Sequence, residues 1–162
     1  FQLHMKSGPD GDNRVRSTIG QQFGLYIVVP SPIQMACDLP ENYEKHLDWL
    51  QFIKDVAVDW DRSIPVAGKV GQYVAWARTP KENDNWYLGA ANADGEHQLS
   101  IALDFLEEGV TYEAQIYRDA DDADWETNPY AVTIETKTYV KGDSFDVRLA
   151  SGGGFGAILV KQ

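Results

Sequence analysis

Residues 23–39 read FGLYIVVPSPIQMACDL, an almost wholly apolar stretch that Pro30 and Pro32 interrupt. A run of about 17 residues with a proline break is too short for a transmembrane helix. Over residues 18–29 the apolar side chains recur every three or four positions, which predicts a helix that Pro30 ends. Residues 33–37 then predict a short strand that is apolar on both faces, as strands of parallel sheets are.

An acidic residue, Asp38, follows this predicted strand directly. One unit of a (β/α)8 barrel has this order of helix, tight turn, buried strand and terminal acid. In such barrels the functional groups gather at the carboxyl ends of the strands. A second helix is predicted over residues 43–56, because Leu47, Leu50, Ile53 and Val56 form an apolar stripe. A barrel needs eight strands, so we expect residues 14–62 to be its last helix-strand-helix, here called the barrel remnant.

From residue 63 the pattern changes to short segments with a period of two, which predicts strands with one polar face each. Asp94-Gly95, Glu108-Gly109 and Gly142-Asp143 mark turns between them. The expected fold class is mainly β, with a C-terminal antiparallel β-sandwich of Greek-key type over residues 63–162. The predicted strands cover residues 72–78, 86–91, 99–103, 112–117, 132–135, 145–149 and 155–160.

Composition narrows the possible partners. The chain has 162 residues and a formal net charge of −11, which argues against nucleic acid and against an anionic membrane surface. Cys37 is the single cysteine, so an internal disulfide and a cysteine-based zinc site are excluded. Residues 1–5 (FQLHM) resemble a cloning remnant and are left out of the fold prediction, and residues 6–13 are expected to form a mobile polar lead-in.

Several motifs together resemble one enzyme family. PSPIQMACDLPENYE, FIKDVAVDWDRS, GQYVAWAR, NWYLGAAN, LDFLEEGVTYEAQIYRDADDADWETNP and the final GGGFGAILV are similar to the C-terminal part of family-97 glycoside hydrolases, bacterial α-glucosidases and α-galactosidases of the SusB type. The resemblance implies a parent with an N-terminal β-super-sandwich, a catalytic (β/α)8 barrel and a C-terminal β-domain. It also implies a periplasmic or secreted, calcium-dependent parent whose calcium ligands precede this chain, so we expect no cofactor in the fragment.

The resemblance places no catalytic residue and no metal ligand in this chain, because the family's carboxylates lie on earlier barrel strands. Asp38 and Glu41 are candidates for the rim of the substrate pocket, although Asp38 is more simply explained as the cap of the next helix. Trp125 and Trp86 are candidates for stacking on sugar rings. The acidic run at residues 119–126 could offer oxygen ligands to calcium, but a solvated loop is the simpler interpretation.

Two functions remain open. The chain is either an inactive fragment of a hydrolase acting on α-glucosides or α-galactosides, whose β-domain buttresses the barrel, or a stand-alone carbohydrate-binding β-sandwich that uses exposed aromatic residues. The first predicts the rest of the parent barrel as a partner and an oligosaccharide as the parent's substrate. A homo-dimer through the exposed barrel remnant is a further possibility, because a large apolar surface is seldom left in water.

Overall fold

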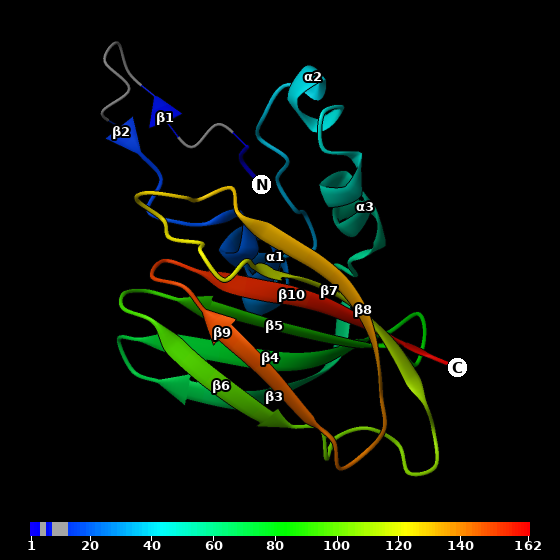
Figure 1. Cartoon of the computed structure of the whole chain (residues 1–162). Coiled ribbons are helices and arrows are strands. Elements are labelled where there is room, and N and C mark those ends of the chain that lie inside the picture. The colour runs from blue at the N-terminus through cyan, green and yellow to red at the C-terminus, as the bar shows by residue number, and fades with distance from the viewer. Residues whose placement is uncertain (4–5, 8–12) are drawn as a thin grey trace.

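A six-stranded antiparallel sheet forms the centre of the molecule, with the strand order β3-β4-β5-β10-β7-β8. The computed structural model describes residues 1–3, 6–7 and 13–162. A second sheet, β6 and β9, lies across one face of the first and makes a sandwich (Figure 1). The predicted antiparallel β-sandwich is therefore confirmed. Its strands are β3 (Trp60–Lys69), β4 (Tyr73–Pro80), β5 (Trp86–Asn92), β6 (His97–Ala102), β7 (Tyr112–Asp119), β8 (Val132–Tyr139), β9 (Ser144–Leu149) and β10 (Gly154–Lys161).

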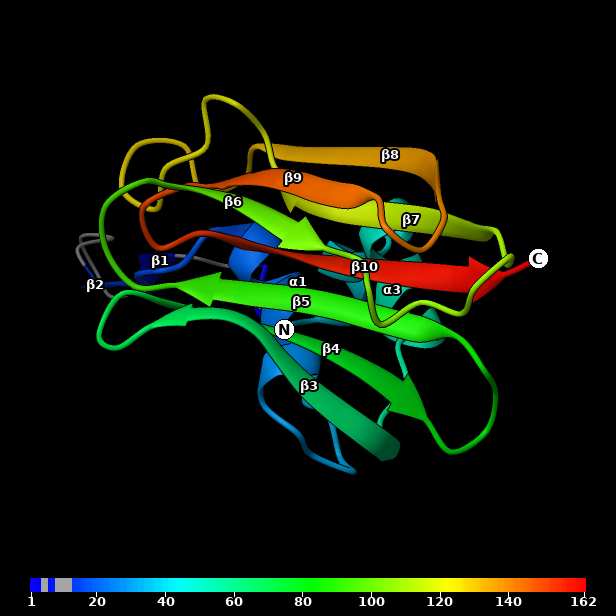
Figure 2. The same ribbon diagram turned by 90° about the horizontal axis from the view of Figure 1, so that it is seen from below.

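Both faces of the six-stranded sheet are covered. One apolar core lies between this sheet and the β6–β9 pair, with Leu88, Phe145 and Phe155 at its centre. The other lies between the sheet and the helical segment, around Phe23 and Phe52. The view from below shows the helices on the side of the sheet away from β6 and β9 (Figure 2). Because strand side chains alternate between faces, neighbouring residues of β5 enter different cores.

The helices are α1 (Ile19–Val28), α2 (Pro40–Tyr43) and α3 (Leu47–Asp55). The Thr18 hydroxyl caps α1 by accepting a hydrogen bond from the Gln21 amide at 3.0 Å, and α1 ends before Pro30 as predicted. The predicted helix over residues 43–56 corresponds to α3, which begins only at Leu47 because the chain turns after Tyr43, the last residue of the separate helix α2. Trp49 and Phe52 face the core, whereas Leu47 of the predicted stripe is 63% exposed. No helix of the described residues is long and apolar enough to cross a membrane.

Two predictions for the N-terminal half were wrong. Residues 33–37 form no strand and are mostly exposed, because a strand that is apolar on both faces needs parallel neighbours, and the described residues supply only the segment at residues 1–3. Phe1 and Leu3, which were set aside as a cloning remnant, are buried in the core beside α1. The rest of the lead-in contributes two short strands, β1 (Lys6–Ser7) and β2 (Asn13–Arg14); residues 4–5 and 8–12 lie outside the described residues.

Candidate functional site

The segment at residues 1–3 lies beside residues 35–38 in a parallel arrangement. The Phe1 nitrogen donates to the Met35 carbonyl, and the Cys37 amide donates to the Phe1 carbonyl at 3.1 Å. In a parallel β-ladder, a residue forms hydrogen bonds with the two residues that flank the residue opposite it. Phe1 bonds in this way to Met35 and Cys37, so Ala36 is the residue opposite Phe1. With α1 between the two segments, this pairing resembles that of a β-α-β unit, although neither segment is a full strand and the sequence analysis predicted no partner at residues 1–3.

Asp38 holds this pair of segments together. One carboxylate oxygen accepts from the Leu3 amide at 2.8 Å, and the other accepts from the Leu39 amide at 2.8 Å and the Asn42 side chain at 2.6 Å. Leu39, not Asp38, occupies the N-cap position of α2, and no side chain caps that helix. The explanation of Asp38 as a helix cap was therefore wrong by one residue. Its place at the end of the Met35–Asp38 segment fits the predicted pocket rim, which stays a prediction, as does that of the exposed Glu41.

The tyrosine at the end of α2 supports the same junction. The Tyr43 hydroxyl donates to the Phe1 carbonyl at 2.6 Å and accepts from the Asp38 amide at 3.3 Å. Burial raises the pKa of Tyr43, so the hydroxyl keeps its proton and remains a donor at neutral pH. The Tyr26 hydroxyl also donates to the Met35 carbonyl, at 3.1 Å. The Phe1–Met35 junction is thus fixed from the side of the helices.

The opposite side of this junction is apolar and exposed. Ile33, Met35 and Leu39 are 75%, 67% and 65% exposed, and Val29 at the end of α1 is 54% exposed. A cavity of about 350 Å³ opens between this segment and α1. Large apolar side chains gathered in one area of a surface mark a contact site for another protein segment. We call Val29, Ile33, Met35 and Leu39 the apolar face.

The seam between α1 and the sheet is unusually close. A Cβ at Gly24 would lie 2.0 Å from the Ala90 carbonyl oxygen and 2.7 Å from that of Phe155. Both are backbone atoms of central strands, which cannot move aside. Gly20 is equally tight, because its Cβ would lie 2.3 Å from a carboxylate oxygen of Asp119. Glycine at these two positions, one turn apart, lets the helix lie directly on the strands.

Asp119, at the end of β7, joins three elements at the start of α1. Its carboxylate accepts from the Thr18 hydroxyl at 2.6 Å, the Gly154 amide at 2.8 Å and the Ala150 amide at 3.1 Å. The side chain is almost fully buried, with 1% exposed. Burial raises the pKa of Asp119, and the hydrogen bonds from Thr18, Ala150 and Gly154 oppose that rise. Sequence analysis missed this role, because Asp119 opens the acidic run that was interpreted as a loop.

Arg78 of β4 fixes the other end of α1. Its guanidinium donates to the Val28 carbonyl at 3.3 Å and to the Ser63 hydroxyl at 2.7 Å, and it lies 5.1 Å from the centroid of the Trp76 ring. A cation at a helix C-terminus interacts favourably with the helix dipole. Burial lowers the pKa of Arg78, although it remains charged at neutral pH. Asp119 and Arg78 together attach both ends of α1 to the β-sandwich.

The two tryptophans predicted to stack on sugars have different surroundings. Trp86 is 5% exposed, lies 4.6 Å from Phe105 by ring centroids and is covered by the Arg62 guanidinium at 5.3 Å. It therefore offers no open ring to a sugar, because both faces of β5 are buried. Trp125 is half-buried in the β7–β8 loop, with the Arg16 guanidinium 5.5 Å from its ring centroid. Its sugar-stacking role stays a prediction.

The acidic run does not fit a calcium site. Asp119 is occupied by three donors, and Asp124 accepts from the Thr127 and Glu126 amides, both at 2.9 Å, which lowers its pKa. Asp122 accepts from the Asn128 side chain at 2.9 Å. Within the residues that the structure describes, no group of three or more histidine, cysteine or acidic side chains is placed to hold a metal ion. We derive no metal chemistry from this loop.

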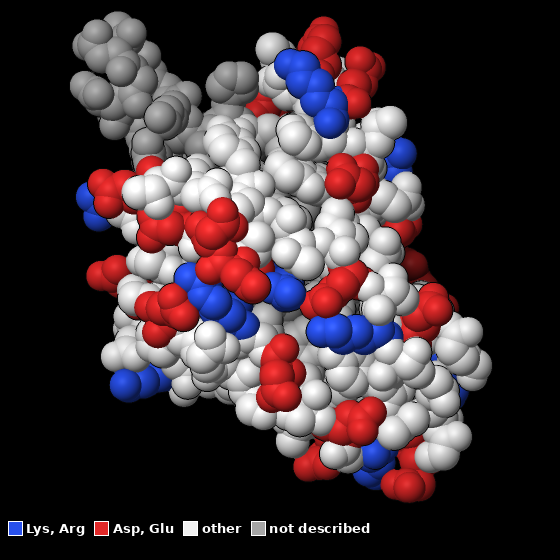
Figure 3. All heavy atoms as spheres, viewed as in Figure 1, with Lys and Arg blue, Asp and Glu red and all other residues white. Residues whose placement is uncertain are grey.

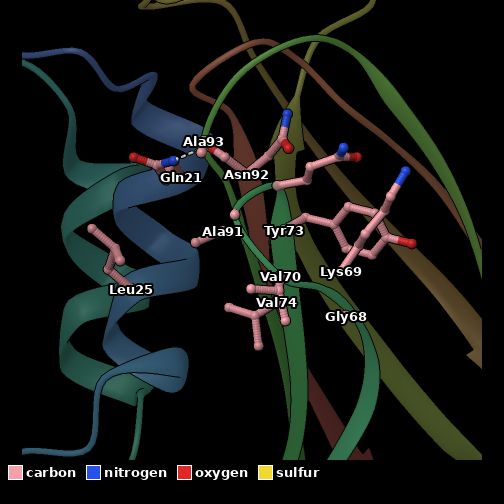
Figure 4. Close-up of a pocket in the computed structure, with 12 residues that line it drawn as sticks. Gln21, Leu25, Gly68, Lys69, Val70, Tyr73, Val74, Ala91, Asn92 and Ala93 are labelled. Carbon is pink, nitrogen blue, oxygen red and sulfur yellow. Dashed lines mark hydrogen bonds between the residues drawn. The ribbon is translucent and has the colours of Figure 1, made fainter.

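Other surfaces are a second apolar cavity and a mixed charged face. The cavity, of about 520 Å³, lies between Leu25 of α1 and the β3–β4 hairpin with Val70 and Val74 (Figure 4). At its upper end the side-chain amide of Gln21 donates to the backbone carbonyl of Asn92 at 2.5 Å. Basic side chains on the face seen in Figure 3 lie among acidic ones. Arg148 and Glu96, 2.8 Å apart, form one of the ion pairs of the described residues.

The comparison with protein families decides what this sandwich is. The family model described as "Glycosyl-hydrolase 97 C-terminal, oligomerisation" matches residues 59–160. The chain belongs to the family-97 glycoside hydrolases. The match begins one residue before β3, a strand that the sequence prediction did not include. The family resemblance stated from the motifs is confirmed.

Relatives support the same assignment. The chain is 33% identical over 141 residues to a retaining α-galactosidase of Bacteroides thetaiotaomicron, and the match covers 87% of this chain and 20% of the relative. It is 26% identical over 137 residues to a probable retaining α-galactosidase of Streptomyces bingchenggensis, covering 85% and 20%. The chain thus spans about a fifth of the length of these curated relatives.

Solved family-97 structures have the same fold. An enzyme from Pseudoalteromonas sp., determined with panose and with acarbose, superposes with a TM-score of 0.89 at 41% identity. The match covers 93% of this chain and 23% of that enzyme. It therefore includes most of the barrel remnant as well as the β-sandwich.

Proposed function

We propose that this chain is the C-terminal part of a retaining family-97 enzyme that hydrolyses α-galactosides or α-glucosides. In this proposal the β-sandwich buttresses the catalytic barrel, and residues 1–58 complete it. The chain by itself is inactive, because a glycoside hydrolase needs two carboxyl groups on either side of the scissile bond. Those groups, and the calcium ligands expected for the family, would precede this chain. The parent would be periplasmic or secreted.

The observation that carries this proposal is the parallel pairing of Phe1 with residues 35–37. A parallel ladder has a second, outer edge, and its strands are buried on both faces in α/β proteins. Here the outer side consists of the exposed Ile33 and Met35. The remaining barrel strands are the partner that would supply both the missing edge and the missing cover.

Relatives support the proposed substrate class. Two curated relatives are named retaining α-galactosidases, and a solved relative binds panose and acarbose. We therefore keep both α-galactosides and α-glucosides in the proposal. An assay with p-nitrophenyl α-galactoside and p-nitrophenyl α-glucoside tests the inactive fragment: we expect no turnover by the purified chain. Turnover that co-purifies with the chain would overturn this part.

Binding to the barrel is tested separately. The chain is co-expressed with the preceding part of the parent enzyme carried on a second plasmid, and we expect the two to co-purify and to hydrolyse one of the two substrates. Ile33→Arg with Met35→Arg should abolish co-purification, because two charges would enter the barrel wall. Val70→Arg is the matched control, since Val70 is an exposed valine outside the apolar face. Co-purification unaffected by the double variant would contradict the proposal.

The two other functions make different predictions. A carbohydrate-binding module would bind starch-type oligosaccharides in calorimetry, and Trp125→Ala would abolish that binding. We expect flat titrations for this chain, since Arg16 already lies against Trp125. A homo-dimer through the barrel remnant would bury the apolar face, so it would be lost in the Ile33→Arg, Met35→Arg variant when its mass is measured by light scattering.

A further inference from the structure

Helix α1 packs against other elements on three sides. Gly24 lies on the sheet, and Tyr26 faces the Phe1–Met35 junction. Phe23 packs against α3. Successive residues of an α-helix are turned by about 100°, so Leu25 lies about 200° around the helix from Phe23 and faces away from α3. Leu25 is 37% exposed, and the cavity of about 520 Å³ opens on this fourth side.

The open side of α1 continues onto one face of β4. Val74 and Leu25 both line the cavity (Figure 4). Trp76 and Arg78 follow Val74 on the same face, because residues two apart on a strand point to the same side. The hydrogen bond from Arg78 to the Val28 carbonyl shows that this face is turned toward α1. Trp76 is half-buried and is not among the residues of either core. We call Leu25, Val74 and Trp76 the lateral groove.

A glycine opposite Val74 leaves the lateral groove wide. Gly68 of β3 pairs with Val74, so the two residues share one face of the sheet. A Cβ at Gly68 would meet only the Tyr73 carbonyl oxygen, at an ordinary 3.6 Å, and Gly68 is not among the glycines with a positive φ angle. The fold of the described residues therefore does not require glycine here. A larger side chain at this position would project into the groove.

The geometry of a barrel indicates what fills the groove. The helices of a (β/α)8 barrel form an outer ring, so each helix is flanked by the helix before it and the helix after it. α3 follows residues 35–38 and lies on one flank of α1. The helix before α1 would precede the segment that contains Phe1, and its place is the flank opposite α3. That flank is the lateral groove.

The groove is also continuous with the surface that we assign to the barrel. Leu25 lines both the 520 Å³ cavity and the 350 Å³ cavity beside Ile33 and Met35. Parts of the barrel that cover the apolar face would therefore extend over Leu25 to β4. Because this chain spans about a fifth of its curated relatives, their remaining length has room for such a helix.

We propose that the lateral groove binds the barrel helix that directly precedes the Phe1 segment in the parent enzyme. That helix would present an apolar stripe, with side chains three or four positions apart, to Leu25, Val74 and Trp76. The inference rests on the proposed function and adds a second contact, made by the β-sandwich itself. Val70, at the tip of the β3–β4 hairpin, is fully exposed and is not part of the groove.

Photo-crosslinking identifies the occupant. p-Benzoylphenylalanine replaces Leu25 or Val74 in the chain co-expressed with the preceding part of the parent, and crosslinked peptides are mapped by mass spectrometry. We expect both positions to crosslink to the helix directly before the Phe1 segment. Val140, 42% exposed in the β8–β9 turn, is the matched control and should not crosslink to that helix. Crosslinks from Leu25 and Val74 to another segment, or no crosslinks, would overturn the inference.

Filling the groove tests its contribution to binding. Gly68→Trp places a ring where the helix would pack, so the amount of co-purified barrel part should fall about tenfold. Urea denaturation of the chain alone should change little, since a Cβ at this position meets almost no other atom. Val140→Trp introduces the same ring at a distant turn and should keep full co-purification.

The failure of this inference differs from the failure of the proposed function. Full co-purification of Gly68→Trp, with loss in the Ile33→Arg, Met35→Arg variant, would contradict the lateral groove and leave the barrel contact in place. If the unmodified pair does not co-purify, the proposed function fails and this inference fails with it.

Discussion

The β-sandwich and the barrel remnant bury their large apolar residues differently. In the sandwich, a core of residues such as Leu88, Leu103 and Phe145 is closed by a second sheet. In the remnant, α1 and α3 bury one side on the sheet, while Ile33, Met35 and Leu39 stay exposed. The sandwich thus closes its own core, whereas one side of the remnant remains open, as the proposed barrel partner requires.

The seam at Gly24 should give the largest effect. Gly24→Ala forces a methyl group against the carbonyls of Ala90 and Phe155, so α1 must lift from the sheet. Overpacking of this kind against the backbone costs about 3 kcal/mol of unfolding free energy, measured by urea denaturation. Gly68→Ala is the matched control, because its Cβ would meet only the Tyr73 carbonyl at 3.6 Å. Equal losses in the two variants would mean that the seam does not couple the two regions.

The Asp119 junction should rank next. Asp119→Ala leaves the Thr18 hydroxyl and the amides of Ala150 and Gly154 without their acceptor. The cost of buried unsatisfied donors predicts a loss of about 2 kcal/mol of unfolding free energy. Asp121→Ala, at an exposed position in the same loop, should change stability little. A small effect at Asp119 would show that α1 is held by packing alone.

The same carboxyl group predicts a pH dependence. Because burial raises the folded-state pKa of Asp119 above its unfolded value, the folded state binds the proton more tightly. Its contribution to stability is therefore largest below the unfolded pKa and is lost as pH rises through the folded pKa. Urea denaturation of the wild type and Asp119→Asn at several pH values should show the wild type gaining relative stability as pH falls. A constant difference between them would contradict the raised pKa.

The Phe1–Met35 junction should give a smaller effect. Tyr43→Phe removes the hydrogen bonds to the Phe1 carbonyl and from the Asp38 amide. We expect a loss of about 1 kcal/mol. Hydrogen exchange should locate this loss in residues 35–43, with the amides of β5 and β10 unchanged. Faster exchange throughout the sandwich would mean that the two regions unfold together.

The apolar face should be the least sensitive. Ile33→Ser with Met35→Ser should change the unfolding free energy by less than about 0.5 kcal/mol, because exposed side chains contribute little to stability. The control Ile158→Ser, in the core beneath α1, should be strongly destabilising, because it buries an extra hydroxyl in an apolar core. A large loss in the double serine variant would show that the remnant is complete without further strands.

Local patterns predicted the sandwich well. Alternating residues located the seven strands from β4 to β10, and the turns at Gly95, Gly109 and Gly142 have the positive φ angles that glycine allows. β3 was missed because Pro65 and two bulges break its alternation. The buried strand at residues 33–37 was predicted from its own composition, but a strand also needs neighbours, and these belong to another part of the parent.

Long-range contacts were beyond the sequence. Trp86 and Tyr87 are neighbours on β5 and lie in different cores, so both faces of that strand are buried. The exposure of a tryptophan ring to a sugar depends on which elements cover that face of the sheet. The local sequence pattern does not reveal those elements. The role of Asp119 could not be predicted for the same reason, because the residue type alone does not distinguish a buried hydrogen-bond acceptor from a solvated carboxylate. Gly20 and Gly24, four residues apart on one helix, were an available signal for the close seam.

The position of β10 has a consequence for how the protein is made. Residues 154–161 lie between β5 and β7, so those two strands cannot join one sheet until β10 has left the ribosome. Until then the underside of α1 has no finished sheet to rest on, and a nascent chain would expose apolar surface from both cores. A stop codon at residue 150 would therefore remove the middle of the sheet rather than its margin, and the shortened product should be cleared by proteases instead of accumulating.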